Sequence, residues 1–361
     1  MHTNTSETEA LEALALQMRA WAAELGFATL GISDANPGKH AKHLHQWLAK
    51  NRHGEMAYMA NGESLRRDPS LLHPGTVRVI SLRMDYGQDD KQALQVLEQQ
   101  DKAYISRYAL GRDYHKLIRS RLATLAKKIQ SYANTQLDFS SNSRPFVDSA
   151  PLLERGFAEK AGLGWIGKNT MLIHPNAGSW FFLGELLTNI ALPIDTEQSS
   201  KHCGRCTACL DICPTKAFTG PFELDARKCI SYLTIELKGE IPVQYRKAIG
   251  NRIFGCDDCQ LVCPWNKFAK PTDEEDFKPR HGLDDSALLS LFMWTENEFE
   301  QRTRGSAIRR IGYQGWLRNL AIALGNGSGG DEVINALRLK KNYSNLLRTH
   351  VEWALAQLQH N

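Results

Sequence analysis

The spacing of apolar residues predicts alternating helices and strands in the first half of the chain. Leu and Ala recur at helical spacing over residues 8–25, and the pattern ends at Gly26. The sequence FATLGI over residues 27–32 predicts a strand, and residues 41–60 predict a second helix with Lys and His on its polar side. Residues 77–84 (VRVISLRM) are mostly apolar, as the buried strands of α/β sheets are. This part of the chain is therefore predicted to combine a sheet with helices.

The clearest amphipathic helix is predicted over residues 112–132. Its apolar residues are spaced by four, three, four and three positions, and they are Ile118, Leu122, Leu125, Ile129 and Tyr132. A turn at Pro151 and a short helix follow, and further strands are predicted over residues 163–173 and 179–190. We therefore assign residues 1–196 to one domain of the α/β or α+β class.

The last part of the chain is predicted to be helical. Residues 269–284 are acidic and contain proline, which is typical of a linker. Helices are then predicted over residues 285–293, 309–324, 331–340 and 343–359. Paired helices joined by a short glycine-rich turn are similar to a HEAT-like repeat. Because a single helix pair cannot bury its own apolar face, this region, residues 269–361, is expected to pack on the rest of the chain.

The chain contains eight cysteines, all between residues 203 and 263. The spacing C-x2-C-x2-C-x3-C-P is that of bacterial two-cluster ferredoxins, in which the fourth cysteine binds the other cluster. Two cubane clusters need eight thiolates, so none is left over. Exchange of the fourth ligands assigns one cluster to Cys203, Cys206, Cys209 and Cys263, and the other to Cys213, Cys229, Cys256 and Cys259. We therefore predict a ferredoxin-like domain with two 4Fe–4S clusters over residues 197–268.

Zinc and disulfide bonds are the alternative uses of these cysteines. Paired C-x2-C motifs also bind zinc, but a zinc ribbon gives no reason for the third cysteine or for the fourth before proline. Disulfides need an oxidising compartment, and the first ten residues (MHTNTSETEA) do not resemble a secretory signal. No apolar run reaches the roughly 18 residues of a membrane span. We therefore expect a cytoplasmic protein without a membrane partner, whose thiols bind metal.

Positive charge is concentrated near the C-terminus. The formal net charge of the chain is +4. Residues 301–361 contain nine Lys or Arg and three Asp or Glu, which gives +6 and leaves −2 for residues 1–300. A basic segment on a nearly neutral body favours a polyanionic partner, although a solvated helical face explains the same charges.

Residues 162–168 (GLGWIGK) fit the glycine patterns of dinucleotide-binding and P-loop proteins. Those patterns follow a strand and open a helix, whereas here a predicted helix precedes and a strand-like stretch follows. Asn169 also stands where a P-loop has Ser or Thr. The glycines therefore indicate a close approach of the backbone to a ligand or to a neighbouring strand, and not nucleotide binding.

Asp148 is the candidate general acid. It lies at the end of an apolar strand, shortly before Pro151, where an aspartate can also cap the following helix. Burial among apolar neighbours would raise its pKa and keep a proton available. Because a redox reaction at the clusters would need a proton source, we favour the acid over the cap.

Several stretches together resemble the epoxyqueuosine reductases, which complete queuosine synthesis in bacterial tRNA. They are RYALGRDYH over 107–115, VDSAPLLER over 147–155, GWIGKN over 164–169, the cysteine pattern through CPWN over 263–266, GWLRN over 315–319 and ALGN over 323–326. The cysteine pattern alone is shared with many ferredoxin-like proteins. The specificity of the resemblance comes from its combination with VDSAPLLER and GWIGKN.

The resemblance implies a cobalamin-binding domain of the reductive-dehalogenase type, distantly similar to nitroreductases, with cobalamin held base-off. The Asp-x-His at 113–115 lacks the glycine of the cobalamin-ligating pattern, since Ile118 stands there, which agrees with a cobalt without histidine ligand. Asp257 and Asp258 lie between cluster cysteines, where acids disfavour reduction, so they are expected to bind a group outside the cluster. The residues implied to contact the corrin are Arg67, Arg107, Tyr108, Arg112, His115, Asp148, Ala150, Gly164, Lys168, Asn169, Asp257 and Asp258.

The implied reaction is the reduction of epoxyqueuosine to queuosine at the wobble position of a tRNA with a GUN-type anticodon, with Asp148 as proton donor. The basic HEAT-like region would hold the tRNA through Arg309, Arg310, Arg318 and Lys340. We expect a monomer that receives electrons from a flavodoxin or ferredoxin. Three alternatives stay open: a reductive dehalogenase-like corrinoid enzyme acting on a small molecule, a two-cluster electron-transfer module, and an RNA-binding scaffold with structural clusters.

Overall fold

The computed structural model describes residues 5–87, 90–197 and 202–359. Contacts within the chain group it into two compact units, each built from segments that are distant in the sequence. The first unit comprises Met1–Tyr86, Tyr114–Cys206 and Pro264–Lys270, and the second comprises Gly87–Asp113, Thr207–Cys263 and Pro271–Asn361. The three domains predicted above stay a prediction, and residues 198–201, near their first boundary, lie outside the described residues.

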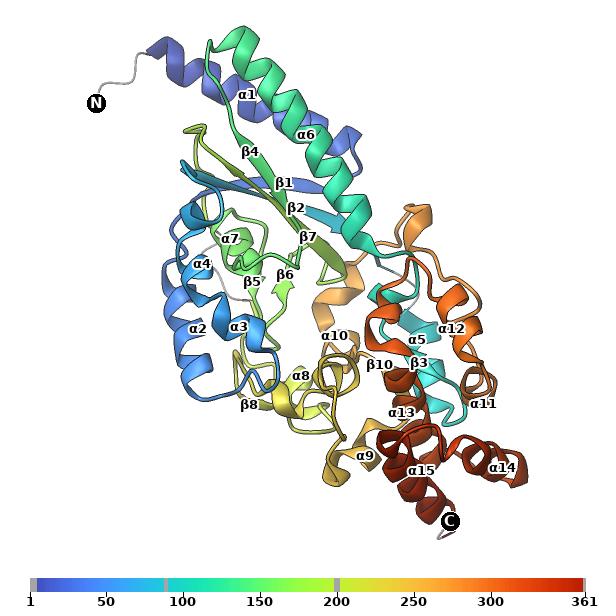
Figure 1. Ribbon diagram of the computed structural model, residues 1–361. Coiled ribbons are helices and arrows are strands. Elements are labelled where there is room, and N and C mark those ends of the chain that lie inside the picture. The colour runs from blue at the N-terminus through green and yellow to red at the C-terminus, as the bar shows by residue number, and fades with distance from the viewer. Residues whose placement is uncertain (1–4, 88–89, 198–201, 360–361) are drawn as a thin grey trace. The chain divides into compact units, whose positions relative to one another are not determined.

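A four-stranded sheet forms the centre of the first unit (Figure 1). Its strand order is β1 (Thr29–Asp34), β2 (Arg78–Asp85), β7 (Phe181–Thr188) and β4 (Ser143–Phe146), and all neighbours are antiparallel. Directly paired residues point to the same face of a sheet. Gly31, Ser81, Glu185 and Phe146 form one such row across the four strands, so their Cβ positions share one face.

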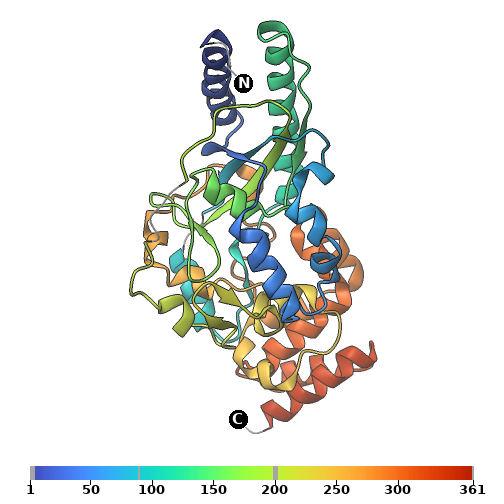
Figure 2. The ribbon, with the colours of Figure 1, turned by 90° about the vertical axis from the view of Figure 1, so that its left-hand side faces the viewer.

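Helices cover both faces of this sheet. The helices α1 (Thr5–Glu24) and α6 (Tyr114–Gln136) lie side by side on one face (Figures 1 and 2). A Cβ at Gly184 would lie 2.8 Å from Ile118 of α6, so the glycine permits this close packing. On the opposite face α7 (Glu154–Lys160) packs against β1, β2 and β7. Glu185, the next residue along β7, therefore faces α7.

Two predicted elements of the first unit are divided in the structure. The helix predicted over residues 41–60 is replaced by α2 (Lys39–Ala49) and α3 (Ala57–Asn61), which α4 (Glu63–Arg67) follows. Asn51 and Gly54, which lie between these two helices, both have positive φ angles, and this backbone conformation ends α2. The strand predicted over residues 163–173 is a hairpin of β5 (Trp165–Ile166) and β6 (Leu172–Ile173), because Thr170 turns the chain with a φ of 66°.

The second unit is mainly helical, with short strands. Its helices are α5 (Asp90–Glu98), α8 (Ala208–Asp211), α9 (Val243–Ile249), α10 (Asp258–Leu261), α11 (Leu288–Phe292), α12 (Glu296–Arg302), α13 (Gly312–Gly325), α14 (Asp331–Lys340) and α15 (Asn345–Leu358). Its strands are β3 (Tyr104–Ile105) and β10 (Arg252–Phe254), which are parallel, and the antiparallel β8 (Phe218–Gly220) and β9 (Glu223–Leu224). The short 3-10 and π-helical turns of both units are Pro69–Leu71, Arg107–Ala109, Ala226–Lys228, Tyr232–Glu236, Pro264–Phe268, Glu275–Phe277 and Ala307–Ile311.

The helix α13 is the centre of the second unit and packs on α11, α15 and β10. Trp316 is fully buried and stacks on Trp294 with ring centroids 5.5 Å apart. A Cβ at Gly325 would lie 2.7 Å from the Cα of Ala354 in α15, which brings the two helices into close contact. Leu283, in the segment predicted as a linker, is buried in the same apolar core. That segment is therefore packed into the second unit.

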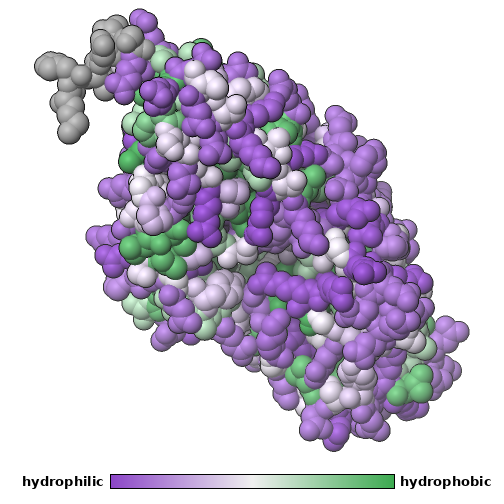
Figure 3. Space-filling model, turned by 45° about the horizontal axis from the view of Figure 1, so that its top comes forward, coloured by the Kyte–Doolittle hydropathy of each residue, from purple (hydrophilic) through white to green (hydrophobic). Residues whose placement is uncertain are grey.

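None of the helices in the described ranges combines the length and the apolarity that a bilayer span requires. On the face of the molecule shown in Figure 3, hydrophilic side chains predominate and apolar ones occur in small separate groups.

Candidate functional site

Asp148 stands in a strained loop of the first unit. It follows β4 and has a φ of 46°, in the left-handed region that residues other than glycine seldom adopt. Its backbone N–H donates to Oε1 of Glu154 at 2.5 Å. Its side chain is 50% exposed. The residue at the N-cap of α7 is Leu153, not Asp148. The loop therefore presents the carboxyl outward and does not place it at the helix cap. The burial that the sequence predicted for this side chain is absent, because half of its surface is exposed, and its role as a general acid stays a prediction.

His115 is a partner of this carboxyl. Its Nε2 lies 3.2 Å from Oδ2 of Asp148. The imidazole stacks on Tyr114 with centroids 4.2 Å apart, and Tyr114 stacks on Phe182 of β7 at 3.9 Å. The sheet thereby fixes the orientation of the imidazole. His115 is thus placed to bind the carboxyl of Asp148, and it keeps 25% of its surface exposed.

Two glutamates lie behind Asp148, and the sequence did not single them out. Glu154 is half-buried at the start of α7, and Glu185 is fully buried in the middle of β7. Burial and the charge of Asp148 raise the pKa of Glu154 from 4.5 to about 7. Burial and the nearby Glu154 hold the pKa of Glu185 well above its usual range. Asp148, Glu154 and Glu185 therefore form a cluster of three carboxyls, in which the pKa values of the two glutamates are raised.

The other first-unit residues implied to contact the corrin occupy different settings. Arg67 ends α4 and is exposed, whereas Ala150 is half-buried in the Asp148 loop. A Cβ at Gly164 would lie 2.2 Å from the carbonyl oxygen of Ile173. This glycine is therefore explained by the neighbouring strand of its own hairpin. Asn169 is buried, and its Oδ1 accepts from the backbone N–H of Met171 at 3.2 Å.

Lys168 connects this hairpin to the first cysteine loop. Its ammonium donates to the carbonyl oxygens of Gly204 at 2.8 Å and Cys206 at 2.9 Å. Trp165, in the same hairpin, packs edge-on against Trp265 with ring centroids 5.0 Å apart. The GWIGKN motif thus supports the loop that carries Cys203 and Cys206, a role that the sequence alone did not reveal.

No disulfide joins the eight cysteines, all of which lie in the described ranges. Four belong to the second unit and form one predicted ligand set: Cys213, Cys229, Cys256 and Cys259. Within this set the thiol of Cys229 interacts electrostatically with those of Cys213, Cys256 and Cys259. Among the described residues no group of three or more His, Cys, Asp or Glu side chains is placed to hold a single metal ion. Of the other set, Cys203 and Cys206 belong to the first unit, and Cys209 and Cys263 to the second.

Asp257 and Asp258 stabilise the cysteine loop of the second unit. Asp257 accepts hydrogen bonds from the Tyr104 hydroxyl at 2.8 Å, the Ser106 hydroxyl at 2.6 Å and the Arg107 backbone N–H at 2.7 Å. Asp258 accepts two from the guanidinium of Arg252, at 2.8 and 2.6 Å. Both aspartates are buried. Their oxygens therefore connect the cysteine loop to β3 and β10, and their contact with a corrin stays a prediction.

The remaining corrin candidates lie in the same region of the second unit. Arg107 is buried, with its guanidinium 5.0 Å above the ring centroid of Tyr104. Tyr108 is half-buried beside Phe254, with ring centroids 6.2 Å apart. Arg112 is exposed and pairs with Asp276 at 3.0 Å. Of these three, Arg112 offers the most accessible polar group.

The four basic residues predicted to bind nucleic acid divide into two pairs. Arg309 and Arg310 are each 49% exposed and pair with Glu300 and Glu236. Lys340 is half-buried and donates to the carbonyl oxygen of Trp294 and the hydroxyl of Tyr313, both at 2.7 Å. The first pair is therefore accessible to a polyanion, whereas the ammonium of Lys340 is used by the fold.

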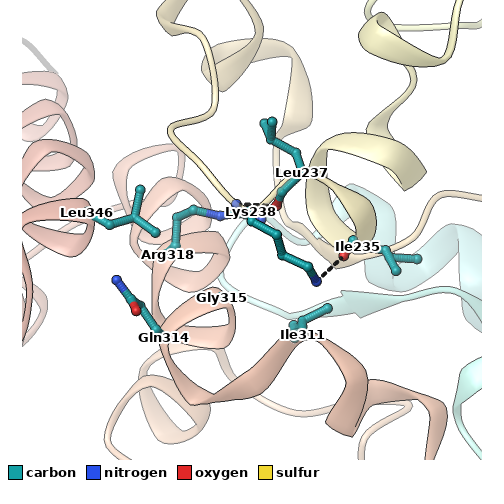
Figure 4. A pocket seen from close by; sticks show the side chains of 8 residues that line it. All are labelled: Ile235, Leu237, Lys238, Ile311, Gln314, Gly315, Arg318 and Leu346. Carbon is teal, nitrogen blue, oxygen red and sulfur yellow. Dashed lines mark hydrogen bonds between the residues drawn. The ribbon is translucent and has the colours of Figure 1, made fainter. Parts of the chain in front are cut away.

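Arg318 is the fourth predicted nucleic-acid residue, and it is 1% exposed. Its guanidinium donates to the carbonyl oxygens of Leu237 at 2.7 Å, Gly239 at 2.9 Å and Leu233 at 3.0 Å. It borders a cavity of about 160 Å³ that Lys238 and Gln314 also line (Figure 4). Arg318 thus joins α13 to the segment around Leu237. Because its guanidinium is buried, Arg318 is not part of the proposed RNA-binding surface.

Comparison with known proteins places these sites in a family. Residues 202–266 match the family model of a 4Fe-4S double cluster binding domain, and residues 66–149 match that of epoxyqueuosine reductase QueG, DUF1730. The chain is 58% identical to the epoxyqueuosine reductase of Pseudomonas aeruginosa, over 95% of this chain and 94% of that one. It is 51% identical to the enzyme of Escherichia coli, over 98% and 91% of the two chains.

Solved structures give the same result. The fold superposes on an epoxyqueuosine reductase solved with an epoxyqueuosine-modified tRNA-Tyr stem loop, with a TM-score of 0.87, 27% identity and coverage of 96% of this chain and 91% of that one. It also matches the Bacillus subtilis enzyme solved with its aspartate catalytic loop swung out of the active site, with a TM-score of 0.85, 27% identity and the same coverage. The chain belongs to the epoxyqueuosine reductase family of oxidoreductases.

Proposed function

We propose that the chain reduces epoxyqueuosine to queuosine at the wobble position of tRNAs with GUN-type anticodons, with Asp148 as proton donor. The observation that supports the acid assignment most directly is the loop geometry. A non-glycine residue at a φ of 46°, fixed by a hydrogen bond to Glu154, presents a half-exposed carboxyl beside His115. Strain of this kind persists where the surrounding structure enforces it, and it clusters at functional sites.

Two 4Fe–4S clusters would carry electrons to the site. The double-cluster family match over residues 202–266 and the eight free thiols support this assignment. Cys213, Cys229, Cys256 and Cys259 would hold one cluster, and the remaining four cysteines the other. A flavodoxin or a ferredoxin is the proposed electron donor. Iron–sulfur clusters reach reduction potentials as low as roughly −700 mV, which is low enough to suit the reduction of cobalamin.

The residues of the first unit fit contact with cobalamin in part. Arg67, Asp148, His115 and Ala150 keep accessible surface, so they would be contacts in that unit. Asp257 and Asp258 already accept hydrogen bonds within the second unit, so they fit a structural role better. Bound cobalamin would supply a strongly reducing cobalt centre for opening the epoxide.

The chain itself would supply position and protons. Converting an epoxide to an alkene takes up two electrons and two protons and releases water. The departing oxygen therefore needs an acid within hydrogen-bond reach. Asp148 supplies this group, and His115, 3.2 Å away, orients the carboxyl. The solved tRNA stem-loop complex of a relative supports a tRNA substrate, and Arg309 and Arg310 are the proposed phosphate contacts.

The test is the replacement Asp148→Asn, measured with epoxyqueuosine-containing tRNA under anaerobic, reducing conditions. Queuosine formation should fall by about 100-fold or more, the scale of a lost general acid, while iron content and the spectrum with added cobalamin stay unchanged. Asp138→Asn is a matched control, because Asp138 is an exposed aspartate of the same unit with the same φ of 46°. Full turnover by Asp148→Asn would remove the acid assignment.

A further inference from the structure

The two glutamates behind Asp148 are not used by the reaction as described so far. Glu185 lies in the central row of the sheet, opposite Ser81 of β2 and Phe146 of β4. It is 0% exposed, although a carboxylate is costly to bury without partners. Glu185 lies in a central strand, on the face that α7 covers, so bulk solvent does not reach its carboxyl. This arrangement therefore needs an explanation.

Among the described residues, neither carboxyl oxygen of Glu185 has a hydrogen-bond donor. The hydroxyl of Ser81, beside it in the row, has no hydrogen-bond partner within the same ranges. The group that acts most strongly on Glu185 is the carboxyl of Glu154. Two adjacent carboxylates with no donor between them repel each other, and one proton held between them removes the repulsion and supplies the hydrogen bond that Glu185 lacks. The geometry thus favours a protonated Glu185 that donates to Glu154.

Glu154 connects this pair to the acid. Its Oε1 accepts the backbone N–H of Asp148 at 2.5 Å, and its charge and that of Asp148 act on each other. The same side chain therefore holds the strained loop and contacts the buried proton. The remaining charged groups that face the cluster are Arg155 of α7, Arg66 of α4, and His115 and Arg119 of α6.

We propose that Glu154 and Glu185 form a buried proton store that holds the Asp148 loop and returns a proton to Asp148 between the two protonations of each turnover. This inference rests on the proposed function of the site. Both glutamates act through Asp148 and are positioning residues that do not touch the substrate.

The proton balance of the reaction gives the store its role. Loss of the epoxide oxygen as water takes up two protons, and a single carboxyl carries one. Asp148 gives its proton to the oxygen as the first carbon–oxygen bond breaks, and it becomes a carboxylate. Glu154 then passes a proton to Asp148, Glu185 replaces it, and Asp148 protonates the hydroxide that leaves as the second bond breaks. The two electrons come from the reduced cofactor, and solvent refills the store after product release.

The first experiment measures the proton itself by infrared difference spectroscopy across a pH titration of the anaerobic holoenzyme. Protein labelled with ¹³C-glutamate should show a protonated carboxyl band that titrates near neutral pH, the value to which the pKa of Glu154 is raised. Glu154→Gln or Glu185→Gln should abolish or shift that band. Glu24→Gln, which replaces a surface carboxyl paired with Lys128, should leave it in place. Absence of the band in the wild-type protein overturns the proposal.

The second experiment measures single turnover with epoxyqueuosine-containing tRNA as a function of pH. The amide oxygen of Glu154→Gln can still accept the hydrogen bond from the Asp148 N–H. The loop should therefore remain in place, and the KM should equal that of the wild-type enzyme. The rate should fall by about tenfold or more, and the inflection near neutral pH should disappear. Glu185→Gln should give the same loss. An unchanged rate and pH profile in both variants would overturn the proposal.

The two experiments separate this inference from the function on which it rests. The infrared band requires no substrate and no turnover. If the wild-type enzyme shows the band but does not convert epoxyqueuosine, the proposed function fails while the buried carboxyl pair stands. If wild-type converts the substrate and the band is missing, the function stands and the proton store fails.

Discussion

The cost of keeping Glu154 beside Asp148 and Glu185 should be measurable as a pH-dependent loss of stability. Its pKa is 4.5 in an unperturbed glutamate and about 7 in the folded protein. A carboxyl with a raised pKa stabilises the fold fully below its unfolded pKa, and this contribution is lost as pH rises through the folded pKa. Between pH 5 and pH 8 the wild-type protein should therefore lose roughly 2.5 kcal/mol that a glutamine at this position does not lose.

The assay is urea unfolding of anaerobic holoenzyme, followed by circular dichroism at pH 5, 6, 7 and 8. Glu154→Gln retains the shape of the side chain and cannot ionise, so its advantage over wild type should grow with pH by that amount. Comparing the two proteins at each pH cancels the contributions of the clusters and of other titrating groups. Glu24→Gln controls for removal of a surface carboxyl. Parallel stability curves for wild type and Glu154→Gln would refute the raised pKa.

Three further outcomes test the remaining assignments. Anaerobically reconstituted protein should contain about eight irons per chain, and four or fewer in an elemental analysis would contradict the two ligand sets. Charge reversal of Arg309 and Arg310 should weaken tRNA binding and reduce the slope of affinity against salt by about two contacts, whereas Lys127→Glu on α6 should not; an unchanged slope would remove both arginines from the interface. Arg318→Met should lower the unfolding midpoint by several degrees, because three carbonyl oxygens, that of Leu233 in a buried bond, lose their donor, and a wild-type midpoint would show that these bonds are dispensable.

The spacing of apolar residues was sufficient to predict the elements that bury one regular face. The helix α6 has buried residues at four of the five predicted positions, and the fifth, Tyr132, is half-buried. The helix α14 begins and ends at the predicted residues 331 and 340. The strands β2 and β7 were likewise predictable, because they are buried on both faces and read as apolar runs. The sequence analysis did not predict the helix α12, although Thr295 and Glu298 form a capping box that indicates a helix start.

The double-cluster domain could be predicted because the cysteine pattern is a local motif. The acid role of Asp148 rests on another local motif and stays a prediction. Interactions between distant segments could not be predicted. Asp257 binds Tyr104 and Ser106, about 150 positions away in the chain, so no local pattern reveals its role. Arg318 was predicted as a surface charge because it lies in the basic C-terminal segment, yet its carbonyl partners come from another segment. Glu185 was hidden inside an apolar strand, where a single acid reads as an exception and not as a site.

Two features of the Asp148 site work against the stability of the first unit. One is the left-handed backbone of Asp148, and the other is a carboxyl with no donor in the middle of the sheet. Alanine or leucine at Glu185 would remove the second cost without disturbing the strand pattern. Glu154 fixes the strained loop and also interacts with the buried carboxyl of Glu185. Both destabilising features therefore involve Glu154. A redox reaction that consumes two protons requires a carboxyl that can be protonated repeatedly near neutral pH, so the proposed acid role of Asp148 would give the two costs one common explanation.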